Sequence, residues 1–289
     1  MAVSGVFGIG YQRLTPGLPG VGAIVAKTVT LEPRAGNPEK RIIETPSGML
    51  NSIGLQNSGV KHFLECELPD LLELEMPIIV SIGGSTIREY EECSRQIAEN
   101  EQVDAVELNV SCPNVDKGCV DFGSDEKALG ALVRRVRRAL RSKPLIVKLT
   151  PNVTDIVPPA VAAADEGADA IALINTLRGM AIDLVTYRPK LGNRTGGLSG
   201  QAIHPVAVYM VHRCYTLCCR TRHLPLIGMG GVATGDEALE LILAGATCVG
   251  IGTAMFRDPS VFETVARHLE RHLEERGYDS VASIVGKCR

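Results

Sequence analysis

The chain of 289 residues contains no tryptophan, and aromatic residues make up only 4% of it. Proteins that bind single-stranded nucleic acid stack the bases on aromatic side chains, so this composition argues against such a surface. The formal net charge of −3 gives no electrostatic support for nucleic-acid binding either. There is no apolar run of about 18 residues and no evident signal peptide, so we expect a cytoplasmic protein without a membrane span.

The nine cysteines lack the spacing of a disulfide framework or a metal site. Cys214, Cys218 and Cys219 lie close together, but no second group of ligands matches them. They fall in a stretch with helical character, so structural cysteines in a reducing cytosol are the simpler interpretation. We therefore expect no metal bound by this chain.

A regular alternation of short apolar runs with amphipathic stretches organises the sequence. Most of the apolar runs show no polar alternation, as expected for parallel strands buried on both faces. Eight runs are expected to be strands: Ala2–Val3, Gly22–Thr28, Pro77–Ser81, Ala105–Val110, Leu145–Leu149, Ala170–Ile174, Leu226–Gly228 and Cys248–Ile251. The clearest helices are expected at Thr86–Glu99, Glu126–Arg141, Ile156–Glu166, Ala202–Cys219, Asp236–Ala244 and Pro259–Arg276, with Thr86 and Asp236 as N-terminal caps.

Eight strands that alternate with helices predict a (β/α)8 TIM barrel of the α/β class, in a single domain over residues 1–289. The alternative is an open doubly wound sheet, but the G-x-G-x-x-G fingerprint of its first turn is missing. The long insertion from Leu31 to Gly59 follows the second strand and is rich in Gly, Pro, Asn and Ser. Insertions after barrel strands lie on the catalytic face, so we expect this one to be functional.

The carboxyl ends of the expected strands carry polar or glycine residues, and active sites of barrels lie at these ends. In chain order the ends present Ser4-Gly5, Lys27-Thr28, Ser81, Asn109 with Cys112, Lys148, Asn175-Thr176, Gly230-Gly231 and Gly252-Thr253. Barrels often bind phosphate with the loops after strands seven and eight, where glycines let backbone N–H groups approach the oxygens. The last two pairs therefore predict a phosphate site.

Two side chains have chemistry that an ordinary core would not need. Lys148 lies within the apolar run Leu145–Leu149, and a buried ammonium needs an anion or an electron-rich partner. A salt bridge to Glu107 is one interpretation, and a cofactor that gains negative charge during turnover is the other. Cys112 follows a strand and can act as a base or nucleophile, although a buried cysteine is often only a small hydrophobe.

These residues together resemble the class 1 dihydroorotate dehydrogenases, and most of all their class 1B catalytic subunit. The resemblance runs over nearly all 289 residues. Segments 150–155 and 196–200 favour subtype B over subtype A. The motifs that carry the resemblance lie at 4–8, 27–30, 51–57, 109–114, 147–155, 174–176, 196–200, 228–232 and 252–253.

The resemblance implies a barrel that holds FMN, with dihydroorotate or orotate stacked on the flavin. Cys112 would be the catalytic base, and Lys148 would stabilise negative charge on the reduced ring. Contacts to FMN are implied for Ser4, Lys27, Thr28, Asn109, Lys148, Ile174, Gly200, Gly230, Gly231, Gly252 and Thr253. Contacts to the pyrimidine are implied for Lys27, Asn51, Ile53, Gly54, Leu55, Asn109, Asn175 and Thr176. A homodimer is implied too, with a partner subunit that carries FAD and a 2Fe–2S cluster and passes electrons to NAD+.

The chain also departs from the family pattern. A stretch that caps the barrel normally precedes the first strand and is missing here, Ser81 stands where asparagine is expected, and Cys119 is an additional thiol and a second candidate base. Other functions stay open at this point. They are a class 1A enzyme that uses fumarate, a pyrimidine reductase similar to dihydropyrimidine dehydrogenase, a phosphate-sugar isomerase without flavin, and a catalytically silent flavoprotein.

Overall fold

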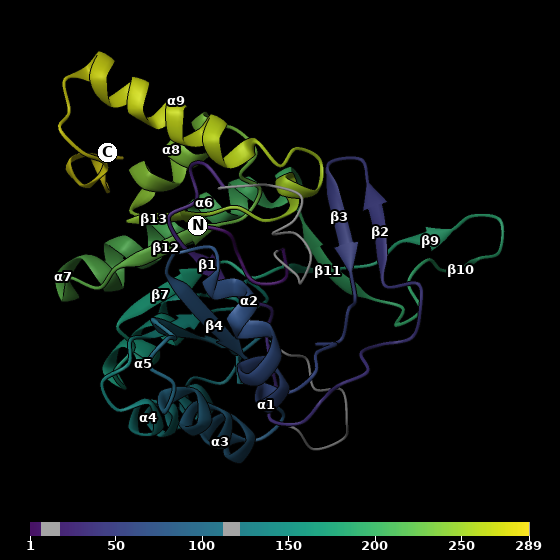
Figure 1. Ribbon diagram of the computed structural model, residues 1–289. Helices are drawn as coiled ribbons and strands as arrows, with labels where there is room; N and C mark the ends of the chain where they lie inside the picture. Colours follow the sequence, from purple (N-terminus) through teal and green to yellow (C-terminus); the bar gives the residue numbers. More distant parts are fainter. Residues whose placement is uncertain (7–17, 112–121, 289) are drawn as a thin grey trace.

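The computed structural model describes residues 1–6, 18–111 and 122–288. Its centre is a curled parallel sheet of seven strands, with helices packed around its outer side (Figure 1). The strands, in their order across the sheet, are β1 (Ile24–Val25), β4 (Ile78–Ile82), β5 (Ala105–Asn109), β6 (Leu145–Lys148), β7 (Ala170–Leu173), β12 (Leu226–Met229) and β13 (Cys248–Gly250).

Residues 1–3 close this sheet into a ring. Ala2 forms parallel bridges both to Ile24 of β1 and to Ile251 beyond β13. The N–H of Ala2 donates to the carbonyl of Ala23 at 3.0 Å, and the N–H of Val3 donates to that of Ile251 at 3.1 Å. The first strand is thus very short, but it occupies the eighth place. The predicted (β/α)8 barrel is confirmed, and the closed ring excludes the open doubly wound sheet.

The six predicted helices are all present. They are α3 (Ile87–Ala98), α4 (Glu126–Leu140), α5 (Val157–Asp165), α6 (His204–Cys214), α8 (Gly235–Ala244) and α9 (Val261–Arg276), while π-helical residues Tyr215–Cys219 continue α6 into α7 (Arg220–Arg222). Thr86 caps α3 as predicted, with its side chain accepting from the N–H of Glu89. The prediction of Asp236 as a cap was wrong: Thr234 caps α8, because its side chain and that of Glu237 form a reciprocal capping box. Between β1 and β4, α1 (Val60–His62), π-helical Phe63–Glu67 and α2 (Leu68–Leu72) cover the sheet.

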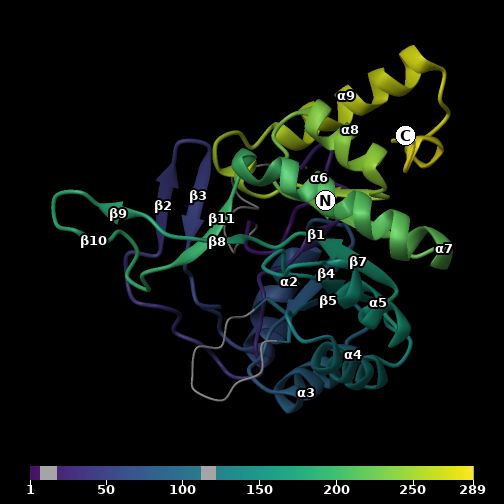
Figure 2. The ribbon, with the colours of Figure 1, turned by 180° about the vertical axis from the view of Figure 1, so that it is seen from behind.

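Two insertions build a second, antiparallel sheet beside the barrel mouth. Its strands, in order, are β2 (Ile42–Thr45), β3 (Gly48–Asn51), β11 (Gly196–Ser199) and β8 (Leu177–Gly179). β2 and β3 lie within the insertion at residues 31–59, while β8 begins directly after β7 and so marks the carboxyl end of the barrel strands. A hairpin of β9 (Ile182–Asp183) and β10 (Arg188–Pro189) projects from this sheet (Figures 1 and 2).

The barrel interior changes from apolar to polar along its axis. A buried apolar cluster of Val25, Ile79, Ala105, Ile146, Ala172, Ile227 and Met229 fills one level. Alternate residues of a strand point to the same face, so the side chains two positions further along also point inward. Four of those positions hold the polar residues Lys27, Ser81, Glu107 and Lys148, while Ile174 and Met229 occupy them after Ala172 and Ile227. Polar groups are therefore concentrated toward the carboxyl ends of the strands. Among the described residues, no helix is long and apolar enough to cross a bilayer.

Candidate active site

A chain of hydroxyl and amide groups crosses the mouth of the barrel. The Oγ of Ser4 lies 3.1 Å from Oγ1 of Thr28, which lies 2.9 Å from Oγ of Ser81. Asn109 also donates through Nδ2 to Oγ1 of Thr28 at 3.4 Å. Four strand ends far apart in the sequence thus meet at one hydroxyl. Ser81, which departs from the family pattern, joins the same chain through Thr28.

Two carboxamides stand side by side next to this chain. Asn175 donates through Nδ2 to Oδ1 of Asn109 at 3.2 Å. The backbone carbonyl of Asn109 accepts from the hydroxyl of Tyr90 at 2.8 Å, and Oδ1 of Asn175 accepts from the N–H of Thr176 at 2.8 Å. The bonds of Asn109 to Thr28 and Asn175, and that of Asn175 to the N–H of Thr176, fix the directions of both amides before any ligand binds. An ordered pair of this kind suits a planar ligand with alternating donors and acceptors.

Lys148 forms a buried ion pair with Glu107. Their side chains are 8% and 2% exposed, and Nζ lies 3.6 Å from Oε1, so the salt bridge that was one of the two interpretations of Lys148 is present. That separation is longer than a hydrogen bond. Among the described residues, Oε1 of Glu107 accepts no hydrogen bond. A lysine ammonium has three donors, so this pairing leaves donor capacity on Lys148 for a further group in the barrel.

The segment 51–55 reaches from the second sheet toward this cluster. Asn51, at the end of β3, donates through Nδ2 to the carbonyl of Gly197 at 3.4 Å. Gly54 has a φ of +73°, and a Cβ there would lie 2.6 Å from Asn37. Leu55 comes near Thr28, since a Cβ built on Gly83 would lie 3.0 Å from a side-chain carbon of each. The backbone therefore holds this segment in one shape over the mouth.

Glycines line a cradle on the opposite side of the mouth. Gly200, Gly230 and Gly231 have φ values of +94°, +133° and +76°. A Cβ on Gly231 would lie 3.0 Å from the carbonyl oxygen of Gly200, so these two loops approach closely. The hydroxyl of Thr253 donates to Oγ of Ser199 at 2.8 Å, so the loop after β13 also lies at the cradle. Neither the N–H of Gly231 nor that of Thr253 donates to another described residue, which suits an anion.

The remaining predicted residues lie around these features. Ile174 is buried beside the cradle, with a side-chain carbon 3.3 Å from a Cβ built on Gly230. Lys27 is half-buried next to Gly5 in the first loop. Cys112 and Cys119 both lie outside the described residues, so the role of either thiol stays a prediction. The residue before Cys112 is fixed, because the N–H of Ser111 donates to Oδ1 of Asn109 at 3.2 Å.

Sequence reasoning missed Asn152, which joins two loops of the site. It donates through Nδ2 to the carbonyl of Thr176 at 3.0 Å, and its Oδ1 accepts from the N–H of Arg178 at 2.8 Å. The loop after β6 is thereby tied to the segment that follows β7. Its position in the motif at residues 150–155 was the only available signal.

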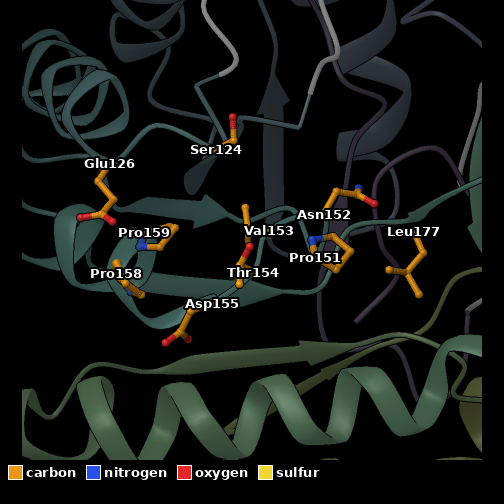
Figure 3. A pocket seen from close by; sticks show the side chains of 10 residues that line it. All are labelled: Ser124, Glu126, Pro151, Asn152, Val153, Thr154, Asp155, Pro158, Pro159 and Leu177. Atoms are coloured by element: carbon orange, nitrogen blue, oxygen red, sulfur yellow. The ribbon is translucent and has the colours of Figure 1, made fainter.

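An open cavity of about 620 Å³ lies next to this loop (Figure 3). Asp155, in its lining, bonds Arg213 at 2.8 Å, and its pKa is lowered by the N–H of Val157 first and then by Arg213. The lining includes none of the residues of the hydroxyl chain or the glycine cradle. It comprises Ser124, Glu126, Pro151, Asn152, Val153, Thr154, Asp155, Pro158, Pro159 and Leu177. The cavity therefore lies beside the candidate site and is not part of it.

The cysteines of the α6 region behave as structural side chains. Cys214, Cys218 and Cys219 are free and buried. Burial raises the pKa of each thiol, for Cys219 to about 12, so all three stay protonated and unreactive near neutral pH. Within the described part of the chain, no three His, Cys, Asp or Glu residues are grouped closely enough to hold a metal ion.

Comparison with known proteins gives consistent matches. The model of the dihydroorotate dehydrogenase family matches residues 1–273. A dihydroorotate dehydrogenase B (NAD(+)) catalytic subunit from Geobacter sp. (strain M21) is 49% identical over 287 residues, covering 99% of this chain and 92% of the relative. Proteins with the same description from Pelobacter propionicus and Desulforudis audaxviator are 50% and 48% identical. Each match covers 99% of this chain, and the matches cover 93% and 92% of the two relatives, respectively.

Proposed function

Because this chain belongs to the dihydroorotate dehydrogenase family, we propose that it oxidises dihydroorotate to orotate in the de novo synthesis of pyrimidines. The observation that carries the proposal is the paired carboxamides of Asn109 and Asn175, 3.2 Å apart in a barrel mouth that also contains a buried lysine. A pyrimidine ring presents alternating carbonyl and N–H groups, which such amides can read. The identity of nearly half over the whole chain supports the same reaction.

We propose FMN as the cofactor, and the residues present fit it. A phosphate needs donors without bulk, which the cradle of Gly200, Gly230, Gly231, Gly252 and Thr253 supplies. The ring needs a cation near the atoms that become negative, which is a role for Lys148. Further contacts are proposed for Ser4, Lys27, Thr28, Asn109 and Ile174. When bound, FMN supplies the acceptor for the hydride that leaves C6 of dihydroorotate.

The pyrimidine is proposed to lie against the carboxamides. Asn51, Asn109 and Asn175 would bond its carbonyl and N–H edges, and Lys27 would neutralise its carboxylate. Ile53, Gly54, Leu55 and Thr176 would complete the contacts. The rigid segment 51–55 supports this arrangement, because a preformed loop loses less conformational entropy when the ligand binds.

Cys112 is proposed to take the proton from C5. A free thiol has a pKa of about 8.5, so an efficient base near neutral pH needs some stabilisation of the thiolate. The Ser111 N–H bond to Asn109 supports the placement, because it anchors the start of the loop with Cys112 at the proposed pyrimidine contact. Lys148 would stabilise the negative charge of the flavin ring once that ring is reduced.

We propose that electrons leave through a partner subunit that carries FAD and a 2Fe–2S cluster and reduces NAD+. The relatives are described as catalytic subunits of an NAD(+) enzyme, which supports a separate partner. The sequence of this chain has no G-x-G-x-x-G fingerprint of its own. If fumarate rather than NAD+ with the partner sustained turnover, the class 1A alternative would replace this proposal.

The substrate can be tested with the purified chain under anaerobic conditions. Dihydroorotate is expected to bleach the visible absorbance of the bound flavin, whereas dihydrouracil, which lacks the carboxylate, should not. The reason is that Lys27 would have no charge to neutralise in dihydrouracil. Preferential bleaching by dihydrouracil would favour a pyrimidine reductase, a colourless protein would favour an isomerase, and a yellow protein that neither compound bleaches would favour a silent flavoprotein.

We further propose that the chain forms a homodimer through the hairpin of β9 and β10. Its exposed apolar side chains support this, because monomers seldom expose such a group of them together. They are Met180 and Ile182, each 50% exposed, with Leu184 at 81%, Val185 at 88% and Tyr187 at 84%. The hairpin projects from the second sheet, where a second copy of the chain could cover it (Figure 2).

A double substitution tests this interface. Val185→Asp with Tyr187→Asp is expected to convert a dimer into a monomer in sedimentation equilibrium, because it would bury two carboxylates without partners. Leu217→Asp is the matched control, since Leu217 is also exposed, at 54%, but lies in π-helical residues Tyr215–Cys219. A wild-type monomer, or a double variant that stays dimeric, would contradict the proposal. If the double variant stayed dimeric but no longer bound the electron-transfer subunit, the hairpin would instead be the surface that binds that subunit.

A further inference from the structure

His204, the first residue of α6, has an acceptor at each of its two ring nitrogens. The residue is 6% exposed. Nδ1 lies 2.9 Å from the carbonyl oxygen of Gly230, and Nε2 lies 2.9 Å from Oε2 of Glu240 in α8. A carbonyl oxygen only accepts hydrogen bonds, so Nδ1 donates to Gly230 when this bond forms. The ring thus lies directly behind the glycine cradle and holds its backbone by this bond.

The bond to Gly230 determines which way the next N–H points. The C=O of Gly230 and the N–H of Gly231 belong to one planar trans peptide unit and point in opposite directions. Holding the carbonyl toward His204 therefore turns the N–H of Gly231 away from it and into the cradle. That N–H donates to no other described residue. A Cβ on Gly231 would lie 2.7 Å from Cβ of His204, so the turn also rests directly on this side chain.

A second contact fixes the same segment to the loop beyond the turn. Gln201 donates to Oε1 of Glu237 at 2.7 Å. The other oxygen of Glu237 accepts from the N–H groups of Ala233 and Thr234, at 2.7 and 2.8 Å. Residues 201–204 thus hold the β12–α8 loop at two places, on either side of Gly231.

We propose that His204 is a positioning residue for the phosphate of the flavin: it aims the Gly231 N–H into the cradle. This inference rests on the proposed function, since FMN is the ligand that brings the phosphate. His204 itself need not touch the phosphate. It acts through the peptide it holds, and its effect should therefore depend on the phosphate and not on the flavin ring.

Binding of two flavins separates this role from a purely structural one. The flavin-free full chain is titrated with FMN and with riboflavin, which has the same ring but no phosphate. His204→Leu is expected to weaken FMN binding about tenfold, as for loss of one hydrogen bond, and to leave riboflavin binding unchanged. His204→Asn should restore most of the FMN affinity, because its carboxamide N–H can donate to the carbonyl of Gly230 in place of Nδ1.

His268→Leu is the matched control. Nε2 of His268 bonds Oδ1 of Asp236 at 2.9 Å on the same helix α8, but makes no hydrogen bond to the glycine turn, so both affinities should stay at the wild-type level. Equal losses for FMN and riboflavin in His204→Leu would make His204 merely structural and overturn the inference, as would unchanged FMN binding. Wild-type protein that binds neither flavin would refute the proposed function itself, and the role of His204 with it.

Discussion

Replacement of Cys112 by alanine is expected to slow flavin reduction by dihydroorotate at least about 100-fold, while FMN stays bound. A positioned general base contributes roughly 10²–10⁴-fold, and alanine has no group that could take the proton from C5. Rapid mixing of the anaerobic variant with dihydroorotate gives the rate directly. The absorbance of the bound flavin before mixing shows whether the cofactor has been retained.

Two other cysteines make this experiment specific. Cys66→Ala removes an exposed thiol of the π-helical segment Phe63–Glu67, and it should react at the wild-type rate. Cys119→Ala tests the second candidate base, which the sequence places in the same loop. If Cys119→Ala were slow and Cys112→Ala fast, the base would be Cys119. If both were fast, a thiol base would be excluded.

Lys148→Met is expected to have the second large effect, on stability as well as on rate. Glu107, 2% exposed, would be left without the ammonium that lies 3.6 Å away. Removing one partner of a buried pair destabilises a protein by about 3–5 kcal/mol, which denaturant unfolding of the flavin-free chain can measure. Loss of the charge that stabilises the reduced ring should also slow flavin reduction by about 10²–10³-fold.

A double variant separates the two effects. Lys148→Met with Glu107→Gln leaves no unpaired charge in the barrel, so most of the stability should return. The rate of flavin reduction should stay low, because the ammonium is still absent. Recovery of stability and rate together would mean that Lys148 serves only the ion pair, and its catalytic role would have to be abandoned.

The barrel strands were predictable because their signal is local. Runs such as Ala170–Ile174 are apolar throughout, and burial on both faces of a parallel strand requires that pattern. Strand β11 was not predicted, since Gly196-Gly197-Leu198-Ser199 has the composition of a loop. It is a strand because it pairs with β3 and β8. Gly197 fits there because a Cβ would lie 2.0 Å from Oγ1 of Thr176. Such distant partners leave no local pattern.

Several residues of the candidate site were also predictable from the sequence, because they follow the expected strands. The rule that barrel sites lie at strand ends brings Thr28, Asn109 and Asn175 together, and their hydrogen bonds confirm that they meet. His204 was missed because its partners come from the loop after β12 and from α8, and a histidine at a helix start has many ordinary explanations. The role of Cys112 stays a prediction, since it lies outside the described residues.

A crystal structure of the chain with FMN and orotate would show directly whether the proposed site is right. The phosphate is expected at Gly231 and Thr253, the flavin ring beside Lys148, and orotate between the flavin and the carboxamides of Asn109 and Asn175. Cys112 should then face C5 from the side opposite the flavin. A flavin bound elsewhere, for example in the open cavity beside Asp155, or a Cys112 directed away from the pyrimidine, would contradict the proposed site.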